Sequence, residues 1–464
     1  MRILMFSNTY KPTISGVVTS ISMFRQGLRT AGHEVYLIAP EYANYEDDEP
    51  YIFRFPAIDM PVRFDWSVPL APKIAMEPTV RGIRPEIIHA HHPVVMGGMA
   101  NSFAQDLQIP LVFTFHSRYD QYVQQYVPIV SELAGWVTDE IITRYIEQCT
   151  HVIAPTSSIR AFILSRYTQN TPVSVVPTPV DLHQYHHLEP QRVRSALGLE
   201  DAEVLLYVGR LAEEKNLDFI LRAFVHIAAQ RPHSRLLLVG KGPYESGLKR
   251  LAEKLDIARQ VIFTGPIPHT EVPHYAAAAD LFVFSSHTDT QGLVLIESMA
   301  AGTPIVALKA PGPVDVLAEG GGLLVDSEGN EDNEWCFADA VLALLEDRPR
   351  LEAMQQEAIR VAQRFSIPAT TARLIQVYET AIQQQAEHTS KASTKSVSNA
   401  AGHGSDRREE MRQQFRFLST KLTQALKIGG ESEWGDTRLQ ALRLQLQSML
   451  QEIDDALSKT PTRQ

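Results

Sequence analysis

Charged residues that suit a phosphate ligand follow an apolar segment in the second half of the chain. Residues 209–216 carry Arg210 and Lys215 in a glycine-led loop between a strand-like segment and a helix-like one. Open α/β sheets bind ligands at the carboxyl ends of parallel strands, where such a loop would lie. A guanidinium meets a diphosphate as a planar fork, and an ammonium meets it as a point charge. The loop is therefore a candidate diphosphate site, and two solvated surface cations are the alternative.

A second cluster contains two carboxylates, Asp289 and Glu297, with seven residues between them. Asp289 is expected in a loop after a strand, and Glu297 in the first turns of the following helix. Gly292 lies between them and lets backbone amides at the helix N-terminus approach an anionic ligand. An ionised carboxylate accepts hydrogen bonds from two hydroxyl groups, so the pair suits a sugar. The alternatives are local capping or pairing by Glu297 and a glycosidase-like acid–base pair.

Short apolar segments alternate with helix-length amphipathic segments, which predicts parallel strands joined by crossover helices. The strands expected in a first unit are residues 2–6, 34–39, 86–90, 111–115, 151–154 and 173–176. The rhythm restarts with residues 204–209, 235–240, 261–264, 281–285, 304–308 and 322–325. Helices are expected at residues 17–31, 130–148, 217–230, 244–254, 271–278 and 293–301. Both candidate ligand loops follow strands of the second α/β unit.

The composition of the chain changes after residue 385. Residues 386–405 are rich in Ser, Thr, Ala and Lys, so we expect a flexible linker there. Residues 406–464 carry apolar residues at helical spacing on both sides of Gly429-Gly430, which predicts a helical hairpin. Such a hairpin packs on itself or mediates self-association, and membrane contact is the minority interpretation.

Bulk composition limits the class of function. The 464-residue chain is 44% hydrophobic with a formal net charge of −11, which argues against a general nucleic-acid binder. Its two cysteines, Cys149 and Cys336, do not indicate a disulfide framework, which favours the cytosol. The N-terminus lacks the pattern of a secretory signal, and no apolar run of about 18 residues predicts a membrane-spanning helix. We predict a cytoplasmic protein and leave peripheral contact with the inner face of the membrane open.

Six motifs, in their order along the chain, resemble those of the retaining GT-B glycosyltransferases numbered family 4. Two are the loops described above, which match the family's G-R-L-x-x-E-K-[GN] loop and its pair of glutamates separated by seven residues. The others are Gly16 in the first loop, residues 88–93, Phe115-His116 and residues 176–181. The chain departs from the family at Asp289, which replaces the first glutamate and is shorter by about 1.5 Å. It also carries Thr178-Pro179 where the family has Asn-Gly.

The resemblance implies an α/β protein with the GT-B fold, in which two Rossmann-like domains face each other across a cleft. Residues 1–178 would form the N-terminal acceptor domain, and residues 179–365 the nucleotide-sugar donor domain. Residues 366–385 would form a return helix that packs on the first domain, and the linker and hairpin would follow as a C-terminal helical extension.

The resemblance also implies roles for individual residues. Arg210 and Lys215 would hold the donor diphosphate, and Glu297 would bind the ribose hydroxyls. Asp289 would bind a donor-sugar hydroxyl, and His116 would contact the donor sugar near the reacting carbon. Further donor contacts are expected from Gly16, Gly209, Gln291, Gly292 and Leu293. No cofactor or metal is expected, because His89 and His91 share one strand face, His92 lies opposite, and no clear third ligand accompanies them.

A narrower resemblance concerns the acceptor. Residues 112–128, with their regularly spaced tyrosines, and residues 92–97 resemble bacterial diacylglycerol glucosyltransferases. This implies a hexosyltransferase that moves glucose from UDP-glucose to a hydroxyl of diacylglycerol or another membrane lipid, although core packing explains the tyrosines equally well. The alternatives are a mannosyl- or galactosyltransferase with a polysaccharide or soluble acceptor, and a non-catalytic protein that binds a sugar nucleotide.

Overall fold

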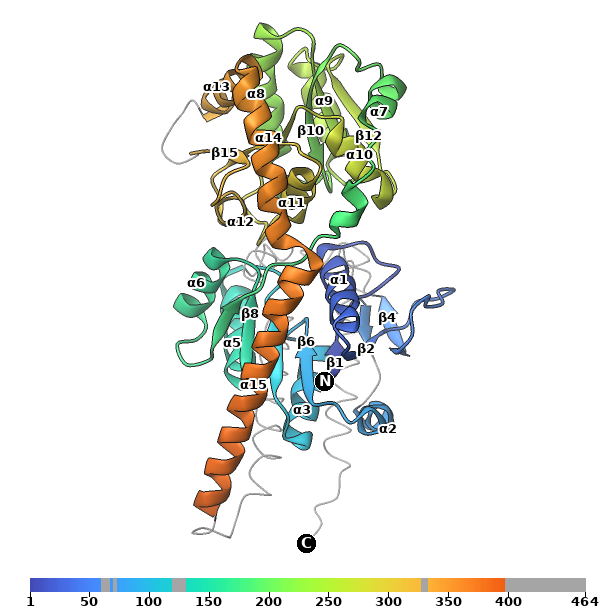
Figure 1. Ribbon diagram of the computed structural model, residues 1–464, viewed down its shortest axis with the longest axis vertical. Coiled ribbons are helices and arrows are strands. Elements are labelled where there is room, and N and C mark those ends of the chain that lie inside the picture. Colours follow the sequence, from blue (N-terminus) through green and yellow to red (C-terminus); the bar gives the residue numbers. More distant parts are fainter. Residues whose placement is uncertain (60–66, 70–72, 119–130, 327–332, 397–464) are drawn as a thin grey trace, which may run out of the picture.

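The structure is a computed structural model that describes residues 1–59, 67–69, 73–118, 131–326 and 333–396. Two parallel sheets, one in each half of the chain, lie one above the other along the long axis (Figure 1). Within the described residues, no helix combines the length and the apolar character needed to span a membrane. The predicted α/β architecture with two Rossmann-like units is confirmed.

The first sheet has seven strands among the described residues, in the order β3-β2-β1-β6-β7-β8-β9. Its strands, all paired in parallel, are β1 (Arg2–Phe6), β2 (Glu34–Pro40), β3 (Ile52–Phe55), β6 (Ile87–Ala90), β7 (Leu111–Thr114), β8 (His151–Ala154) and β9 (Val173–Val175). Its helices are α1 (Gly16–Thr30), α2 (Lys73–Ile83), α3 (Met96–Leu107), α5 (Ser131–Gln148) and α6 (Ser157–Arg166). A short antiparallel pair, β4 (Ala57–Asp59) and β5 (Ser67–Pro69), lies beside it.

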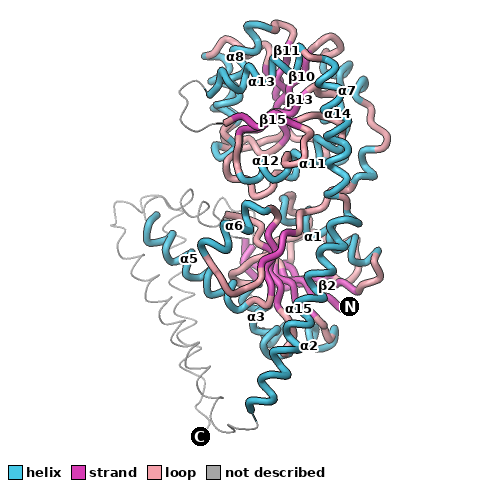
Figure 2. Tube along the Cα trace, turned by 60° about the vertical axis from the view of Figure 1, so that its left-hand side comes forward, coloured by secondary structure: helices cyan, strands magenta, loops and turns pink. Residues whose placement is uncertain are grey.

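Successive residues of the first sheet face opposite layers, as parallel strands covered on both sides require. Leu4 and Phe6 pack with α2, α3, α5 and α6 on one face. Ile3 and Met5 pack with α1 on the other face. Figure 2 shows α3, α5 and α6 on one side of the strands and α1 on the opposite side. The sheet is therefore a rigid base for the loops that leave its carboxyl ends.

The second sheet has six strands within the described part of the chain, in the order β12-β11-β10-β13-β14-β15. They are β10 (Glu203–Val208), β11 (Ser234–Val239), β12 (Val261–Gly265), β13 (Leu281–Phe284), β14 (Ile305–Leu308) and β15 (Gly322–Val325). The main helices around it are α7 (Pro190–Leu197), α8 (Leu217–Gln230), α9 (Glu245–Lys254), α10 (Val272–Ala277), α11 (Leu293–Ala300), α12 (Pro311–Val316), α13 (Asn333–Glu346) and α14 (Arg348–Ala362). Short 3-10 turns are η2 (Leu182–Tyr185), η3 (Glu213–Lys215), η4 (His269–Glu271) and η5 (Gln363–Phe365).

The long helix α15 (Ile367–Ser396) returns from the second unit to the first (Figure 1). Leu374, Val377, Tyr378 and Ala381 are buried against the strands and α1 of the first sheet. Beside the start of this helix, the connection between the sheets forms a parallel bridge from Val180 to Ser366. Two chain segments therefore join the domains at one place.

The end of α15 differs from the prediction. The flexible linker was expected to begin at residue 386, whereas the helix continues through Ser396. Ala, Glu and Lys, which occur in residues 386–396, are favourable helix formers, so a shortage of large apolar residues does not by itself end a helix. The rest of the predicted linker and the predicted hairpin, residues 397–464, lie outside the described residues.

Candidate active site

Both candidate ligand loops leave neighbouring strands at the centre of the second sheet. The first loop follows β10 and the second follows β13, and these two strands pair with each other. The strand order reverses between them, which is the place where open α/β sheets bind ligands. The hydroxyl of Ser285 donates to the carbonyls of Lys215 and Asn216, at 2.9 Å each. The backbone of the first loop is thus fixed to the end of β13.

Lys215 and Asp289, predicted separately, form an ion pair. The ammonium donates to Oδ1 of Asp289 at 2.9 Å and to Oδ2 at 2.8 Å. The two side chains are 19% and 24% exposed. Burial favours the protonated form of Asp289, but Lys215 and the hydroxyl of Ser286 outweigh it and hold the pKa of this carboxyl below its usual 3.8. Asp289 is therefore an ionised carboxylate that lies against the candidate phosphate cation.

Gly209 and Arg210 shape the start of the first loop. Gly209 has a φ of +153°, and a Cβ there would lie 2.8 Å from the hydroxyl of Tyr207. That hydroxyl donates to the carbonyl of Arg210 at 3.1 Å, so a larger residue at position 209 would disturb the turn. The exposed guanidinium of Arg210 makes no hydrogen bond or ion pair within the described part of the chain. It is thus available to an anion.

Two helix N-termini from different domains meet beside these loops. Gly292 has a φ of +76° and precedes Leu293, the first residue of α11. A Cβ at Gly16, the first residue of α1, would lie 3.8 Å from Cδ1 of Leu293. Unpaired backbone amides and the helix dipole give such ends a positive potential. Gly16 therefore stands directly opposite the candidate donor loop.

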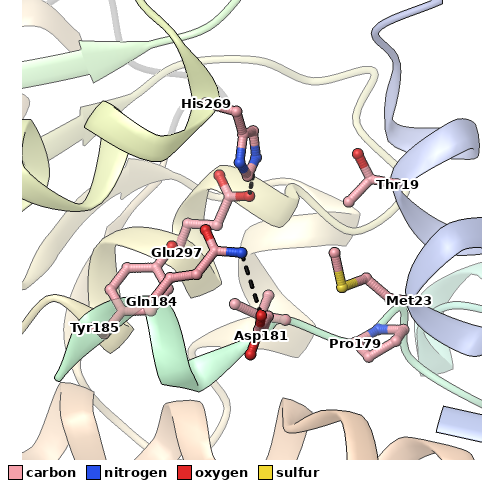
Figure 3. A pocket seen from close by; sticks show the side chains of 9 residues that line it. Thr19, Met23, Pro179, Asp181, Gln184, Tyr185, His269 and Glu297 are labelled. Carbon is pink, nitrogen blue, oxygen red and sulfur yellow. Dashed lines mark hydrogen bonds and ion pairs between the residues drawn. The ribbon is translucent and has the colours of Figure 1, made fainter. Parts of the chain in front are cut away.

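Glu297 lies on α11 at the edge of a small pocket between the domains (Figure 3). The pocket is lined by Thr19, Met23, Pro179, Val180, Asp181, Gln184, Tyr185, His269 and Glu297. Oε1 of Glu297 lies 3.4 Å from Nε2 of His269, and the Glu297 side chain is 13% exposed. The hydrogen bond to Glu297 outweighs burial and raises the pKa of His269 above 6.5. Sequence reasoning missed His269, because nothing in the local pattern links residue 269 to residue 297.

Residues 290 and 291 connect the candidate donor loop to the first domain. The backbone amide of Thr178 donates to Oε1 of Gln291 at 2.8 Å, and Nε2 of Gln291 donates to the carbonyl of Thr178 at 3.2 Å. The hydroxyl of Thr290 donates to the carbonyl of His116 at 2.9 Å. Thr156 donates to the carbonyl of Thr290 at 3.0 Å. These contacts hold the loop against the domain that carries His116.

A further contact between the domains involves Asp315 on α12. Its carboxylate accepts from the backbone amides of Ser157 at 3.1 Å and Ser158 at 2.9 Å. These amides lie at the N-terminus of α6, so an acidic residue of the second domain caps a helix of the first. A Cβ at Gly312, also on α12, would lie 2.8 Å from the carbonyl of Asp289. The helix that forms this cap therefore also packs under the donor loop.

His116 lies two residues after the end of β7, and its ring contacts His91, which follows the neighbouring strand β6. Nε2 of His116 lies 2.9 Å from Nδ1 of His91. His89 and His91 lie with ring centroids 4.2 Å apart, as expected for residues on one strand face. The described residues contain no group of three or more His, Cys, Asp or Glu side chains able to hold a metal ion.

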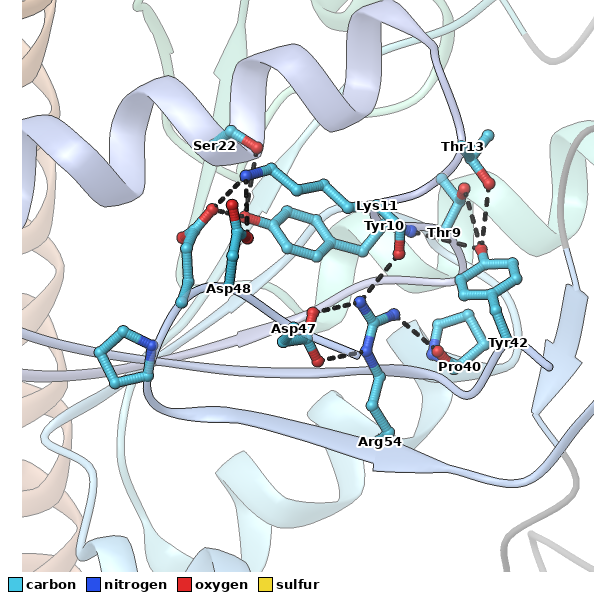
Figure 4. Close-up of polar contacts among 12 residues, drawn as sticks. Thr9, Tyr10, Lys11, Thr13, Ser22, Pro40, Tyr42, Asp47, Asp48 and Arg54 are labelled. Carbon is cyan, nitrogen blue, oxygen red and sulfur yellow. Dashed lines mark hydrogen bonds and ion pairs between the residues drawn. The ribbon is translucent and has the colours of Figure 1, made fainter. Parts of the chain in front are cut away.

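A charged network braces the loop that leads from β1 to Gly16 (Figure 4). Lys11 lies 2.5 Å from Oε1 of Glu49, and the fully buried Arg25 donates to Oε2 of Glu49 at 2.6 Å. Arg54 forms a bidentate pair with Asp47 at 2.6 and 2.9 Å and donates to the carbonyl of Lys11 at 2.8 Å. The network fastens the acidic segment after β2 to the first loop. Sequence reasoning did not single it out.

Two family descriptions match the chain. Residues 191–361 match "Glycosyl transferases group 1", and residues 14–184 match "Glycosyltransferase Family 4". An alpha-monoglucosyldiacylglycerol synthase of Streptococcus pneumoniae is 31% identical over 316 residues, 66% of this chain and 71% of that one. The enzyme of the same name from Acholeplasma laidlawii is 29% identical over 320 residues, 66% of this chain and 80% of that one. The chain belongs to the group 1 glycosyltransferases.

Structural similarity confirms the predicted GT-B fold of this group 1 glycosyltransferase. Sucrose-phosphate synthase from Thermosynechococcus elongatus superposes with a TM-score of 0.67, covering 82% of this chain and 98% of that one. The two sequences are 20% identical, so the similarity concerns the fold. As a glycosyltransferase of this family, the protein acts on nucleotide sugars.

The glycosyltransferase structure brings most of the predicted site residues to one region. Lys215 contacts Asp289, Gly16 lies opposite Leu293, and Gln291 anchors the loop between them. Glu297 lies on the next turn of α11 and faces the pocket instead of the Lys215–Asp289 pair. His116 reaches this region through its carbonyl, which Thr290 binds. The contacts of Thr290 and Asp315 with the first domain were not predicted.

Proposed function

We propose that this glycosyltransferase is a retaining hexosyltransferase that transfers glucose from UDP-glucose to a hydroxyl of diacylglycerol or another membrane lipid. The observation that carries the donor side is the meeting of the Arg210–Lys215 loop with the N-termini of α11 and α1 at the strand-order reversal. The relatives named alpha-monoglucosyldiacylglycerol synthases support the sugar and the acceptor.

In the proposed reaction, cleavage of the donor bond places negative charge on the nucleoside diphosphate. Arg210 and Lys215 hold this diphosphate and stabilise the charge as it develops. The backbone amides of Gly292 and Leu293 add their donors at the start of α11. Glu297 binds the ribose hydroxyls, and His116 contacts the sugar near the reacting carbon.

Retention of configuration follows in this proposal from attack on the same face that the leaving group departs from. The leaving phosphate accepts the proton of the acceptor hydroxyl. Asp289 is not assigned as a nucleophile in this proposal, because its ion pair with Lys215 stabilises the carboxylate and so weakens its attack on the sugar. Its partly exposed carboxylate instead binds a hydroxyl of the donor sugar.

The proposed division of labour follows the two domains. Residues 1–178 bind the acceptor, residues 179–365 bind the donor, and residues 366–385 fasten the second domain to the first. The protein works in the cytoplasm, where it meets its lipid acceptor at the inner face of the membrane. Residues 397–464 serve self-association or membrane contact and take no part in donor cleavage.

A donor and acceptor panel with product mass spectrometry tests the proposal. UDP-, GDP- and ADP-linked hexoses are each offered with diacylglycerol vesicles, a membrane lipid extract or soluble polyols. The proposal expects one hexose added to diacylglycerol or an extract lipid from UDP-glucose, with UDP released. Product on soluble acceptors alone would favour the polysaccharide or soluble-acceptor alternative. Donor binding without cleavage of any donor would leave a sugar-nucleotide-binding protein.

A further inference from the structure

Two histidine rings, those of His89 and His91, lie in a row between the return helix α15 and the ring of His116. Nδ1 of His89 lies 2.7 Å from the hydroxyl of Tyr378 on α15, and its Nε2 lies 2.7 Å from the hydroxyl of Thr114. The ring of His89 is 4.2 Å from that of His91, and His91 is 5.2 Å from His116, centroid to centroid. His89 is thus held by hydrogen bonds at both ring nitrogens, and its ring packs against the ring of His91.

Within the described residues, His91 makes one polar contact through its two ring nitrogens. The residue is fully buried, and Nδ1 lies 2.9 Å from Nε2 of His116. Nε2 of His91 is buried and has no hydrogen-bond partner within the described residues. Burial and then the neighbouring histidines lower the pKa of both His91 and His116 well below 6.5, so each ring carries one proton.

One proton lies between the two rings, and its place decides the tautomer of both. If His116 donates from Nε2, His91 must carry its own proton on Nε2, which leaves a buried N–H without an acceptor. If His91 donates from Nδ1, its buried Nε2 carries a lone pair and no proton, so only an acceptor is left without a partner. Orphaned buried N–H groups are rare in native proteins, and under-satisfied acceptors are less so. The second arrangement is therefore favoured.

We propose that His91 is a positioning residue, which donates from Nδ1 to Nε2 of His116 and so keeps the His116 proton on Nδ1. That nitrogen of His116 has no hydrogen-bond partner within the described part of the chain. It is free to donate to an oxygen of the bound donor, a sugar hydroxyl or a phosphate. The inference rests on the proposed function for its consequence, while the tautomer itself is a property of the free protein.

Nitrogen-15 NMR of the histidine rings tests the tautomer without any substrate. The protein is labelled at histidine, and the signals are assigned with His116→Gln and His91→Asn. The proposal expects protonated Nδ1 and unprotonated Nε2 for both His91 and His116 at neutral pH. A His116 ring that carries its proton on Nε2, or on both nitrogens, would overturn it.

Matched variants test the consequence for donor turnover. His91→Asn keeps an N–H close to the position of Nδ1, whereas His91→Leu removes it. We expect His91→Leu to lower turnover at saturating donor about tenfold, the size of one lost hydrogen bond, and His91→Asn to keep most of it. The control is His151→Leu on β8, a buried histidine bonded to Ser174, which should retain turnover.

The outcomes separate this inference from the proposed function. Equal losses in His91→Asn and His91→Leu would overturn the positioning role. If His91→Leu does not fold, the wild-type tautomer and the His91→Asn turnover decide the question. A wild-type protein that has the expected tautomer but transfers no hexose defeats the proposed function alone. A protein that transfers hexose with the His116 proton on Nε2 defeats this inference alone.

Discussion

The Lys215→Met substitution separates the catalytic role of the ammonium from its structural role. Methionine keeps most of the length of the side chain and removes its charge. The carboxylate of Asp289 then loses the partner that it meets at 2.8 and 2.9 Å. Both stability and turnover should fall, and the structure sets the relative size of the two effects.

The stability loss is bounded by the exposure of the pair. Breaking a fully buried ion pair costs about 3–5 kcal/mol, and an exposed pair is worth about 0–1 kcal/mol. With side chains 19% and 24% exposed, this pair lies between these limits, so we expect a loss of about 2 kcal/mol. Removing a charge from the leaving diphosphate should cost about 3 kcal/mol of transition-state stabilisation, or roughly a hundredfold in rate.

The double variant Lys215→Met/Asp289→Asn distinguishes the two roles. It leaves no uncompensated charge, so chemical denaturation should show recovery of most of the lost stability. Donor turnover, measured as nucleoside diphosphate release, should stay at the level of Lys215→Met or below. The control Lys249→Met breaks an exposed pair with Glu245 on α9 and should change neither quantity much. Near-normal turnover of folded Lys215→Met at saturating donor would refute the assignment.

Three further predictions follow from the contacts of the site. NMR titration should give His269 a pKa above 6.5, and this pKa should fall in Glu297→Gln. Because the pKa is raised in the folded state, the pair stabilises the protein fully below pH 6.5 and less as the pH rises through the raised pKa. A His269 pKa that is unchanged in Glu297→Gln would count against the pair. Turnover should survive EDTA, since Arg210 and Lys215 supply the charge at the diphosphate; loss restored by manganese or magnesium would show this to be wrong. Asp315→Ala should loosen the contact with α6, so that nucleoside diphosphate reduces the radius of gyration more than in the wild type. This prediction assumes that bound nucleotide draws the two domains together, and equal radii from small-angle scattering with and without nucleotide would contradict it.

Much of the fold could be predicted because buried parallel strands are short continuous apolar runs. The predicted strands at residues 2–6, 151–154 and 322–325 match β1, β8 and β15 at both ends. The edge strand β3 was missed, since Ile52–Phe55 contains Arg54, whose side chain binds Asp47. An edge strand with a charged residue carries too weak an apolar pattern to stand out.

The site shows the same division between local and distant signals. Arg210, Lys215, Asp289 and Glu297 occur in compact motifs, so their order in the sequence is informative. The contacts of Thr290 with His116 span 174 residues, and those of Asp315 with Ser157 span 158. Such pairs form only when the two domains meet, and no local pattern encodes them. The contact between Lys215 and Asp289 could likewise be recognised only once the sheet showed that their loops follow the neighbouring strands β10 and β13.

A crystal structure with an unreactive analogue of UDP-glucose tests the donor site most directly. We expect the diphosphate within hydrogen-bond distance of the Arg210 guanidinium and the Lys215 ammonium, beside the start of α11. We expect the ribose on Glu297 and the sugar between Asp289 and His116. A nucleotide bound elsewhere, or one whose phosphates contact neither Arg210 nor Lys215, would contradict the proposed donor site.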